Sequence, residues 1–211
     1  MKAIIFDMDG VIIDSEPLYF DRHIRFLNHH KVELKQEDLH PMAGASGADS
    51  WAILQQIIGD EVEQEVYYQA LSEFHQHTPI DYTEVIDPDI YTVLDYLTNE
   101  NYRIGLASSS GIRTIEKVLQ QGELTDYFDI IMSGEMFERS KPNPEIYLKT
   151  AEKLEVGTDS CLAIEDSTYG IQAAKAAGMY VLAKEDTRFN FEQHLADKKI
   201  KRLTEIIEFL G

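Results

Sequence analysis

Short apolar runs recur along the chain, and most of them stop at polar residues. The runs are brief and contain β-branched residues, which favours buried strands over helices. They occupy residues 2–6, 102–107, 161–164 and 180–183, with a weaker run at 129–132. The pattern therefore predicts several buried strands spread over most of the chain.

Helical patterns separate the later runs. Ile112, Ile115 and Leu119 fall at helical spacing, and the segments 144–154 and 167–177 show similar apolar faces. Strands that alternate with helices of this length indicate βαβ units around a parallel sheet. We therefore predict an α/β fold with a doubly wound, Rossmann-like core, in which ligands bind at the carboxyl ends of the strands.

The segment from residue 15 to about residue 80 breaks this alternation. It contains no convincing strand, and its apolar residues recur at helical spacing. Ser15-Glu16-Pro17 is a typical helix start, with proline in the first turn. We expect an inserted α-helical domain over residues 15–81, and a core formed by residues 1–14 and 82–211.

The composition excludes some classes of protein. The 211 residues carry a net charge of −19, which disfavours nucleic acid as a partner. No stretch approaches the roughly 20 apolar residues of a membrane span. A single cysteine, Cys161, excludes an internal disulfide, and no signal peptide is visible, so we expect a cytoplasmic protein. A monomer that acts on a small molecule is the simplest expectation.

Polar residues follow the predicted strands, where the chemistry of the protein is expected. These clusters occupy residues 7–10, 108–111, 140–144 and 165–167. The carboxyl ends of parallel strands meet at one edge of a sheet, so residues far apart in sequence can share one pocket. We therefore expect the four clusters to form a single site.

The residue types in these clusters indicate phosphoryl chemistry. Asp7, Asp9 and Asp166 offer hard oxygen ligands that suit Mg²⁺, and carboxylates gathered in this way need a cation between them. Lys141 supplies a positive charge, and Ser108 lies before a predicted helix whose amides can donate to phosphoryl oxygens. A carboxylate is also an accepted nucleophile for phosphoryl transfer through an aspartyl-phosphate.

The four clusters, in this order, resemble the four motifs of the haloacid dehalogenase (HAD) superfamily. The motifs read DMDG, SSS, SKPNP and EDS. The resemblance spans the whole chain and is greatest to the subfamily of β-phosphoglucomutase, phosphoglycolate phosphatase and sugar-phosphate phosphatases. It implies a HAD core with an inserted α-helical cap domain directly after the first motif. It also implies a phosphohydrolase that removes phosphate from a small phosphorylated metabolite.

The resemblance also implies roles for individual residues. Asp7 corresponds to the nucleophile and Asp9 to the general acid and base. Ser108, Ser109 and Lys141 correspond to residues that bind the transferring phosphoryl group.

The same resemblance implies a Mg²⁺ site. Asp7, the carbonyl of Asp9, and Asp166 correspond to the ligands of the metal. Glu165 corresponds either to an additional ligand or to a partner of the ligands.

Three other functions remain open. A sugar-phosphate mutase would use the same motifs. A dehalogenase would use the same nucleophile on carbon, but it needs neither a metal nor Asp9 as an acid. A non-catalytic binding protein on this scaffold would be expected to have lost Asp7 or Lys141, and both are present.

Residues that differ from the mutases favour a phosphatase. A mutase must hold a bisphosphate, and the resemblance assigns its second phosphate to a cap arginine and to lysine and asparagine residues after the second motif. This chain has Gly47, Gly111 and Ile112 at those positions. Arg22 or Arg113 remains available to compensate.

Some other residues invite a functional interpretation that we do not favour. His29-His30 and His75-Gln76-His77 lack companion metal ligands, so we expect solvated histidines. Cys161 lies in a predicted strand and is expected to be a small core residue.

Overall fold

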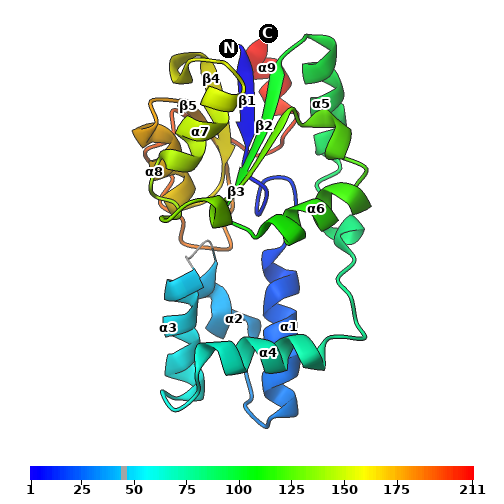
Figure 1. The fold of residues 1–211 in the computed structure, drawn as a ribbon, viewed down its shortest axis with the longest axis vertical. Helices are drawn as coiled ribbons and strands as arrows, with labels where there is room; N and C mark the ends of the chain where they lie inside the picture. The colour runs from blue at the N-terminus through cyan, green and yellow to red at the C-terminus, as the bar shows by residue number, and fades with distance from the viewer. Residues whose placement is uncertain (44–46) are drawn as a thin grey trace. The chain divides into compact units, whose positions relative to one another are not determined.

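The computed structural model describes residues 1–43 and 47–211. The chain forms two compact units, one built from Met1–Asp14 with Tyr82–Gly211 and the other from Ser15–Asp81 (Figure 1). The first unit contains strands and helices, and the described residues of the second are helices and their connections.

A six-stranded sheet forms the centre of the first unit, in the order β3-β2-β1-β4-β5-β6. All neighbouring strands are parallel. The strands are β1 (Ala3–Phe6), β2 (Arg103–Ser108), β3 (Ile130–Ser133), β4 (Cys161–Glu165), β5 (Tyr180–Lys184) and β6 (Lys198–Ile200). The α/β parallel-sheet fold predicted from the sequence is therefore confirmed.

The strand β1 lies in the middle of the sheet, between β2 and β4. Its last residue, Phe6, pairs with Leu106 of β2 and Ile164 of β4. All four residues of β1 are fully buried, as expected for a strand that is covered on both faces. This register brings the polar segments that follow β1, β2 and β4 to the same edge.

The edge strand β6 is not predicted by the sequence analysis. It pairs with the end of β5, and Lys198 and Lys199 are exposed while Ile200 is buried. With only one buried residue in three, the segment has no apolar run, and exposed lysines on an edge strand also oppose pairing with another chain.

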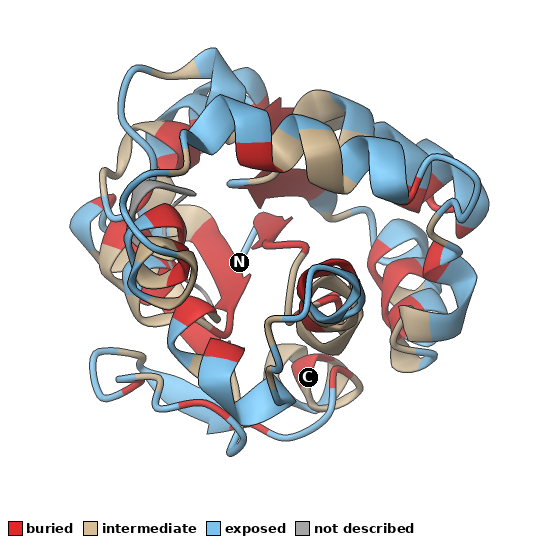
Figure 2. Ribbon diagram, turned by 90° about the horizontal axis from the view of Figure 1, so that it is seen from below, coloured by how far each residue is buried: buried red, intermediate tan, exposed pale blue. Residues whose placement is uncertain are grey.

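Helices cover both faces of the sheet (Figures 1 and 2). The helices are α5 (Asp89–Asn99), α6 (Ile112–Gln121), α7 (Glu145–Lys153), α8 (Thr168–Ala176) and α9 (Glu205–Leu210). Short 3-10 turns are η2 (Tyr82–Val85), η3 (Thr125–Tyr127), η4 (Gly134–Met136) and η5 (Thr158–Ser160). No helix in the part of the chain that the structure describes is both long and apolar enough to cross a bilayer.

The two faces of the sheet are covered by different helices. Helices α7 and α8 pack on the face that bears Ala3 and Ile5. Successive side chains of a strand point to opposite faces, and Phe6 accordingly meets Phe128 edge to face, with ring centroids 6.4 Å apart. Helix α7 lies so close to the sheet that a Cβ at Gly105 would be 2.8 Å from the Thr150 side chain. This close approach places α7 directly against β2.

The second unit consists of α1 (Glu16–His29), α2 (Gln36–Leu39), η1 (His40–Met42), α3 (Gly47–Ile58) and α4 (Gln64–Phe74). Aromatic side chains form much of its interior. His23 of α1 stacks on Tyr67 of α4 and hydrogen-bonds its hydroxyl at 2.8 Å. Burial lowers the pKa of His23 to about 4, so this histidine is neutral at neutral pH.

The histidines of this unit are not all solvated. His29, His30 and His77 are exposed, as predicted. The prediction is wrong for His75, which is buried, because its ring bonds the Arg22 carbonyl oxygen at 2.9 Å and the Thr78 hydroxyl at 3.3 Å. His75 therefore ties the end of α4 to α1 within the same unit.

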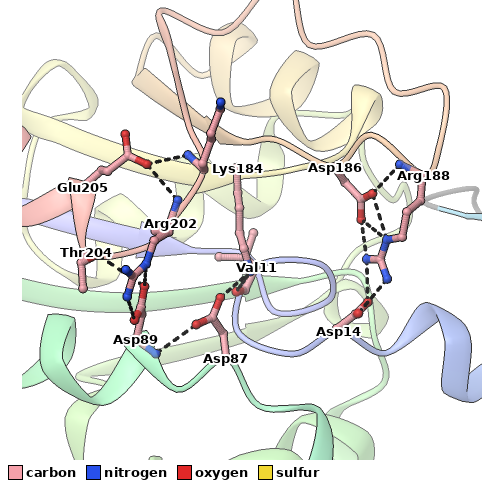
Figure 3. Close-up of polar contacts among 11 residues, drawn as sticks. Val11, Asp14, Asp87, Asp89, Lys184, Asp186, Arg188, Arg202, Thr204 and Glu205 are labelled. Carbon is pink, nitrogen blue, oxygen red and sulfur yellow. Dashed lines mark hydrogen bonds and ion pairs between the residues drawn. The ribbon is translucent and has the colours of Figure 1, made fainter.

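The two ends of the first unit's interrupted chain are paired with each other. Ile13 and Ile86 form an antiparallel bridge, and the Asp14 amide donates to the Val85 carbonyl at 2.8 Å. Arg188 holds Asp14 with both terminal nitrogens, at 2.7 and 2.8 Å (Figure 3). The chain thus leaves and re-enters this unit through two adjacent, anchored segments.

A second set of ionic contacts lies nearby. Lys184 at the end of β5 donates to the Val11 carbonyl and pairs with Asp87 at 2.8 Å. Arg202 and Thr204 contact Asp89 and so connect the start of α9 with the start of α5 (Figure 3). The contact of Lys184 with Val11 fixes the loop after β1 from the side of β5.

Candidate active site

A tight loop directly after β1 carries the first motif. The Asp7 amide donates to the Ile164 carbonyl at 2.9 Å, so the chain stays attached to β4 for one residue beyond the strand. Gly10 then adopts a positive φ of +77°, and its amide bonds the Ile13 carbonyl at 2.7 Å. A side chain at Gly10 would also collide with the Asp166 carboxylate. Glycine is therefore needed both for the turn and for the approach of Asp166.

Lys141 contacts two of the other predicted site residues, Asp7 and Glu165. Its ammonium nitrogen lies 2.7 Å from an Asp7 oxygen, 2.7 Å from Glu165 Oε1 and 2.9 Å from the Ala107 carbonyl oxygen. Lys141, Asp7 and Glu165 are all buried. The three protons of the ammonium group are thus matched by three oxygens, which come from the ends of β1, β2 and β4.

Glu165 accepts further hydrogen bonds. The Tyr147 hydroxyl of α7 donates to Oε1 at 2.5 Å. The Asp166 amide and the Ser167 hydroxyl contact Oε2 at the longer distances of 3.2 and 3.3 Å. A Cβ at Gly170 would overlap the Glu165 carboxylate, so α8 also begins in direct contact with this group.

The electrostatics of the site follow from burial and mutual charge. Burial raises the pKa of Asp7 to about 7, against the opposing effect of Lys141. Burial alone would lower the pKa of Lys141, but Asp7 and Glu165 together hold this pKa above its usual range. Burial, followed by the charge of Glu165, raises the pKa of Tyr147 well above its usual value. Lys141 is therefore a fixed cation and Tyr147 a protonated donor.

Three carboxylates meet where a cation is expected. Single oxygens of Asp7, Glu165 and Asp166 lie within 4.8 Å of one another, the only such group found in residues 1–43 and 47–211. The negative charge of three buried carboxylates is greater than the positive charge of Lys141, which contacts two of them. Oxygen donors of this kind suit Mg²⁺. The residues present therefore fit the ion that the sequence predicts.

The Asp9 carboxylate is not a member of that group. It accepts a hydrogen bond from the Ser110 hydroxyl at 2.7 Å. Ser110 is itself held by the buried hydroxyls of Ser108 and Ser133, which contact its amide at 3.0 Å and its carbonyl at 2.7 Å. The Asp9 carboxylate is thus directed to a serine of the second motif.

The serines of the second motif differ in their surroundings. Ser108 is fully buried, and its hydroxyl oxygen accepts the Ser110 amide. Ser109 is exposed and receives a hydrogen bond from the Ser140 hydroxyl at 3.3 Å. The amide of Ile112, at the start of α6, donates to the Glu135 carboxylate at 3.1 Å. The Ile112 amide, which is among the amides expected to face a phosphate, therefore already donates to a protein carboxylate.

Several residues of this arrangement are not evident from the sequence. Tyr147 lies on the apolar face of the predicted helix 144–154, and Ser133 and Glu135 lie outside the four polar clusters. Each reaches the site from an element distant in sequence, so no local spacing marks it. The one available signal is that Ser133 and Glu135 follow the weakest predicted strand at its carboxyl end.

Comparison with known proteins identifies the family. The haloacid dehalogenase-like hydrolase family matches residues 4–184. Hexitol phosphatase B from Escherichia coli is 34% identical over 97% of this chain and 93% of its own length. β-Phosphoglucomutase from Bacillus subtilis is 32% identical over 86% of this chain and 82% of its own length. The structure of β-phosphoglucomutase from Clostridium difficile, 23% identical, shares the fold with a TM-score of 0.81 over 100% of this chain and 95% of that chain. The chain therefore belongs to the haloacid dehalogenase-like hydrolases, an enzyme family, and the resemblance predicted from its motifs is confirmed.

Proposed function

We propose that this protein is a Mg²⁺-dependent phosphatase that hydrolyses a small phosphomonoester, a sugar phosphate or a similar metabolite. The observation that carries the proposal is the buried Asp7 carboxylate, held by Lys141 beside Glu165 and Asp166 at the edge of a parallel sheet. The chain belongs to a family of hydrolases. In this proposal Asp7 is the nucleophile, Lys141 is the fixed cation, and Asp7, Glu165 and Asp166 are the metal ligands.

Two steps complete the proposed reaction. An Asp7 oxygen attacks phosphorus, the bond from phosphorus to the leaving oxygen breaks, and Asp9 donates its proton to that oxygen. A water molecule then attacks the phosphorus of the aspartyl-phosphate, Asp9 takes up the proton, and the Asp7 carboxylate is released with inorganic phosphate. The bound Mg²⁺ supplies charge neutralisation and alignment of the phosphoryl oxygens.

Lys141 and the serines bind the phosphoryl group in this proposal. All three ammonium protons of Lys141 now face protein oxygens, so the lysine must exchange its contact with Asp7 for one with a phosphoryl oxygen. The Ser108 oxygen accepts the Ser110 amide, and its own proton can be donated to the phosphoryl group. Ser109 is exposed at the same turn and would add a second hydroxyl.

Relatives support a sugar phosphate as the substrate class. Besides hexitol phosphatase B, a fructose-1-phosphate phosphatase from Escherichia coli is 30% identical over 84% of this chain. We assign selection of the substrate to the helical unit Ser15–Asp81, acting as the cap. A monomeric state and a cytoplasmic location remain predictions from the sequence.

A mutase is the second candidate, because β-phosphoglucomutase is among the relatives. The surroundings of the second motif oppose it. The Glu135 carboxylate bonds the Ile112 amide, and a Cβ at Gly111 would lie 2.6 Å from a Glu135 oxygen. A second phosphate dianion would meet this anion where a mutase needs cations. Of the cap residues 43–50 around Gly47, residues 44–46 lie outside the described residues.

Product analysis separates the two candidates. Sugar phosphates and polyol phosphates are tested for phosphate release, and β-glucose 1-phosphate is tested with a trace of the bisphosphate. We expect inorganic phosphate as the main product and little glucose 6-phosphate. Rapid isomerisation with little phosphate release would establish the mutase instead, and no turnover of any phosphomonoester would refute both.

Dependence on Mg²⁺ is a separate prediction. EDTA should abolish phosphate release, and added Mg²⁺ should restore it. Asp166→Ala should raise the Mg²⁺ concentration for half-maximal activity by roughly tenfold or more, because it removes one of three converging carboxylates. Asp126→Ala, at an exposed position on η3, is the matched control. Full activity in EDTA would remove the metal from the mechanism.

A further inference from the structure

We infer that Tyr147 is a positioning residue for the metal site, acting through Glu165. This inference rests on the proposed function, because it assigns the Asp7, Glu165 and Asp166 group to Mg²⁺. Tyr147 is fully buried in α7, and its ring packs within the apolar cluster between α7, α8 and the sheet. Its hydroxyl alone reaches the polar end of that cluster, where it lies 2.5 Å from Glu165 Oε1.

The two oxygens of Glu165 are held unequally. Oε1 receives both the Tyr147 hydroxyl at 2.5 Å and the Lys141 ammonium at 2.7 Å. From the residues that the structure describes, Oε2 receives only the two longer contacts of Asp166 and Ser167, at 3.2 and 3.3 Å. A carboxylate fixed at one oxygen by two donors from different elements cannot rotate freely. Tyr147 and Lys141 thus orient Glu165, while Oε2 retains acceptor capacity toward a cation.

Tyr147 also completes the surroundings of Lys141. Its hydroxyl oxygen lies 3.4 Å from the Lys141 nitrogen, and that nitrogen lies 5.1 Å from the centre of the ring. Burying a hydroxyl is unfavourable unless it has a partner. A phenylalanine ring would fill the same apolar space. Packing therefore does not require the Tyr147 hydroxyl, whose role is its contact with Glu165.

Groups that hydrogen-bond to metal ligands typically change metal affinity by about 10–100-fold when they are removed. We therefore expect Tyr147→Phe to weaken Mg²⁺ binding by about tenfold. Isothermal calorimetry with Mg²⁺ alone, in the absence of substrate, measures this directly. Tyr127→Phe is the matched control, because it deletes a hydroxyl that contacts Asp95 at 2.7 Å on an exposed surface. Activity should follow the same pattern, with the loss in Tyr147→Phe largely recovered as the Mg²⁺ concentration is raised.

A purely structural role for the hydroxyl predicts something different. It would lower the thermal unfolding midpoint in EDTA and leave the dissociation constant for Mg²⁺ unchanged. A change of less than twofold in that constant would overturn the inference while leaving the proposed phosphatase intact. If the wild-type protein takes up no Mg²⁺ in the same titration, the metal assignment fails and the inference fails with it.

Two further measurements make the test independent of one variant. In the Glu165→Gln background, adding Tyr147→Phe should weaken Mg²⁺ binding much less than it does in the wild type, since the effect passes through Glu165. An equal loss in both backgrounds would overturn the inference. In wild-type protein labelled on tyrosine rings, the Tyr147 resonance should shift during a Mg²⁺ titration with the calorimetric dissociation constant, and an unchanged resonance would contradict it.

Discussion

Asp7→Asn should abolish turnover and leave the protein folded. A neutral amide is a poor nucleophile, and the loss of an enzyme's nucleophile costs on the order of 10⁴–10⁶-fold in rate. Asparagine keeps an oxygen that can accept from Lys141, where Asp7 now accepts at 2.7 Å. The substitution thus removes the chemistry at Asp7 while preserving a hydrogen-bond partner for the buried lysine.

Phosphate release and protein mass test this expectation together. The wild-type protein, quenched in acid during turnover, should carry the mass of one phosphoryl group, and Asp7→Asn should not. Asp126→Asn, at an exposed aspartate, should behave as wild type in both measurements. A purified Asp7→Asn protein with the wild-type rate would disprove the assignment of the nucleophile.

Asp9→Asn should slow the reaction by about 10²–10⁴-fold, the usual contribution of general acid–base catalysis. Asparagine retains an oxygen for the Ser110 hydroxyl, which Asp9 now accepts at 2.7 Å, so the loop after β1 should keep its conformation. It cannot donate and recover the proton that the leaving oxygen needs. The defect should therefore depend on how strongly the leaving group requires protonation.

Two substrates reveal that dependence. With an alkyl sugar phosphate, formation of the aspartyl-phosphate requires the proton and should show the full loss. The leaving group of p-nitrophenyl phosphate departs as a stable anion. In a single-turnover burst with this substrate, the rate of the same step should therefore fall much less. Equal losses in the two bursts would indicate that Asp9 acts through structure and not through proton transfer.

The strands were predictable from the sequence where burial on both faces produces a continuous apolar run. Ala3–Phe6 and Cys161–Glu165 are fully buried, and both are evident as runs. The edge strand β6 was not predicted, because an edge strand with one buried residue leaves no such run. His75 was misjudged for the converse reason: its burial depends on the Arg22 carbonyl, a partner 53 residues away in the sequence.

The site was predictable to the extent that it lies directly at strand ends. Asp7, Glu165 and Asp166 are brought together because β1 and β4 are paired in parallel, and Lys141 reaches them from the loop before α7. The placement of the Asp9 carboxylate on Ser110, and of Tyr147 on Glu165, depends on side-chain directions that no spacing encodes. Sequence motifs thus indicated which residues meet, while their hydrogen-bond partners required the structure.

The central position of β1 has a consequence for synthesis of the protein. The strand that directly precedes Asp7 is among the first parts of the chain to be made, but its two neighbours begin only at Arg103 and Cys161. At roughly 5–20 residues per second, β1 waits on the order of ten seconds for its second partner. The helices between Glu16 and Phe74 contact one another within their own unit. An apolar, unpaired strand is prone to wrong pairing during this interval. Slow translation at low temperature, or truncation before Cys161, should therefore favour aggregation of the nascent chain.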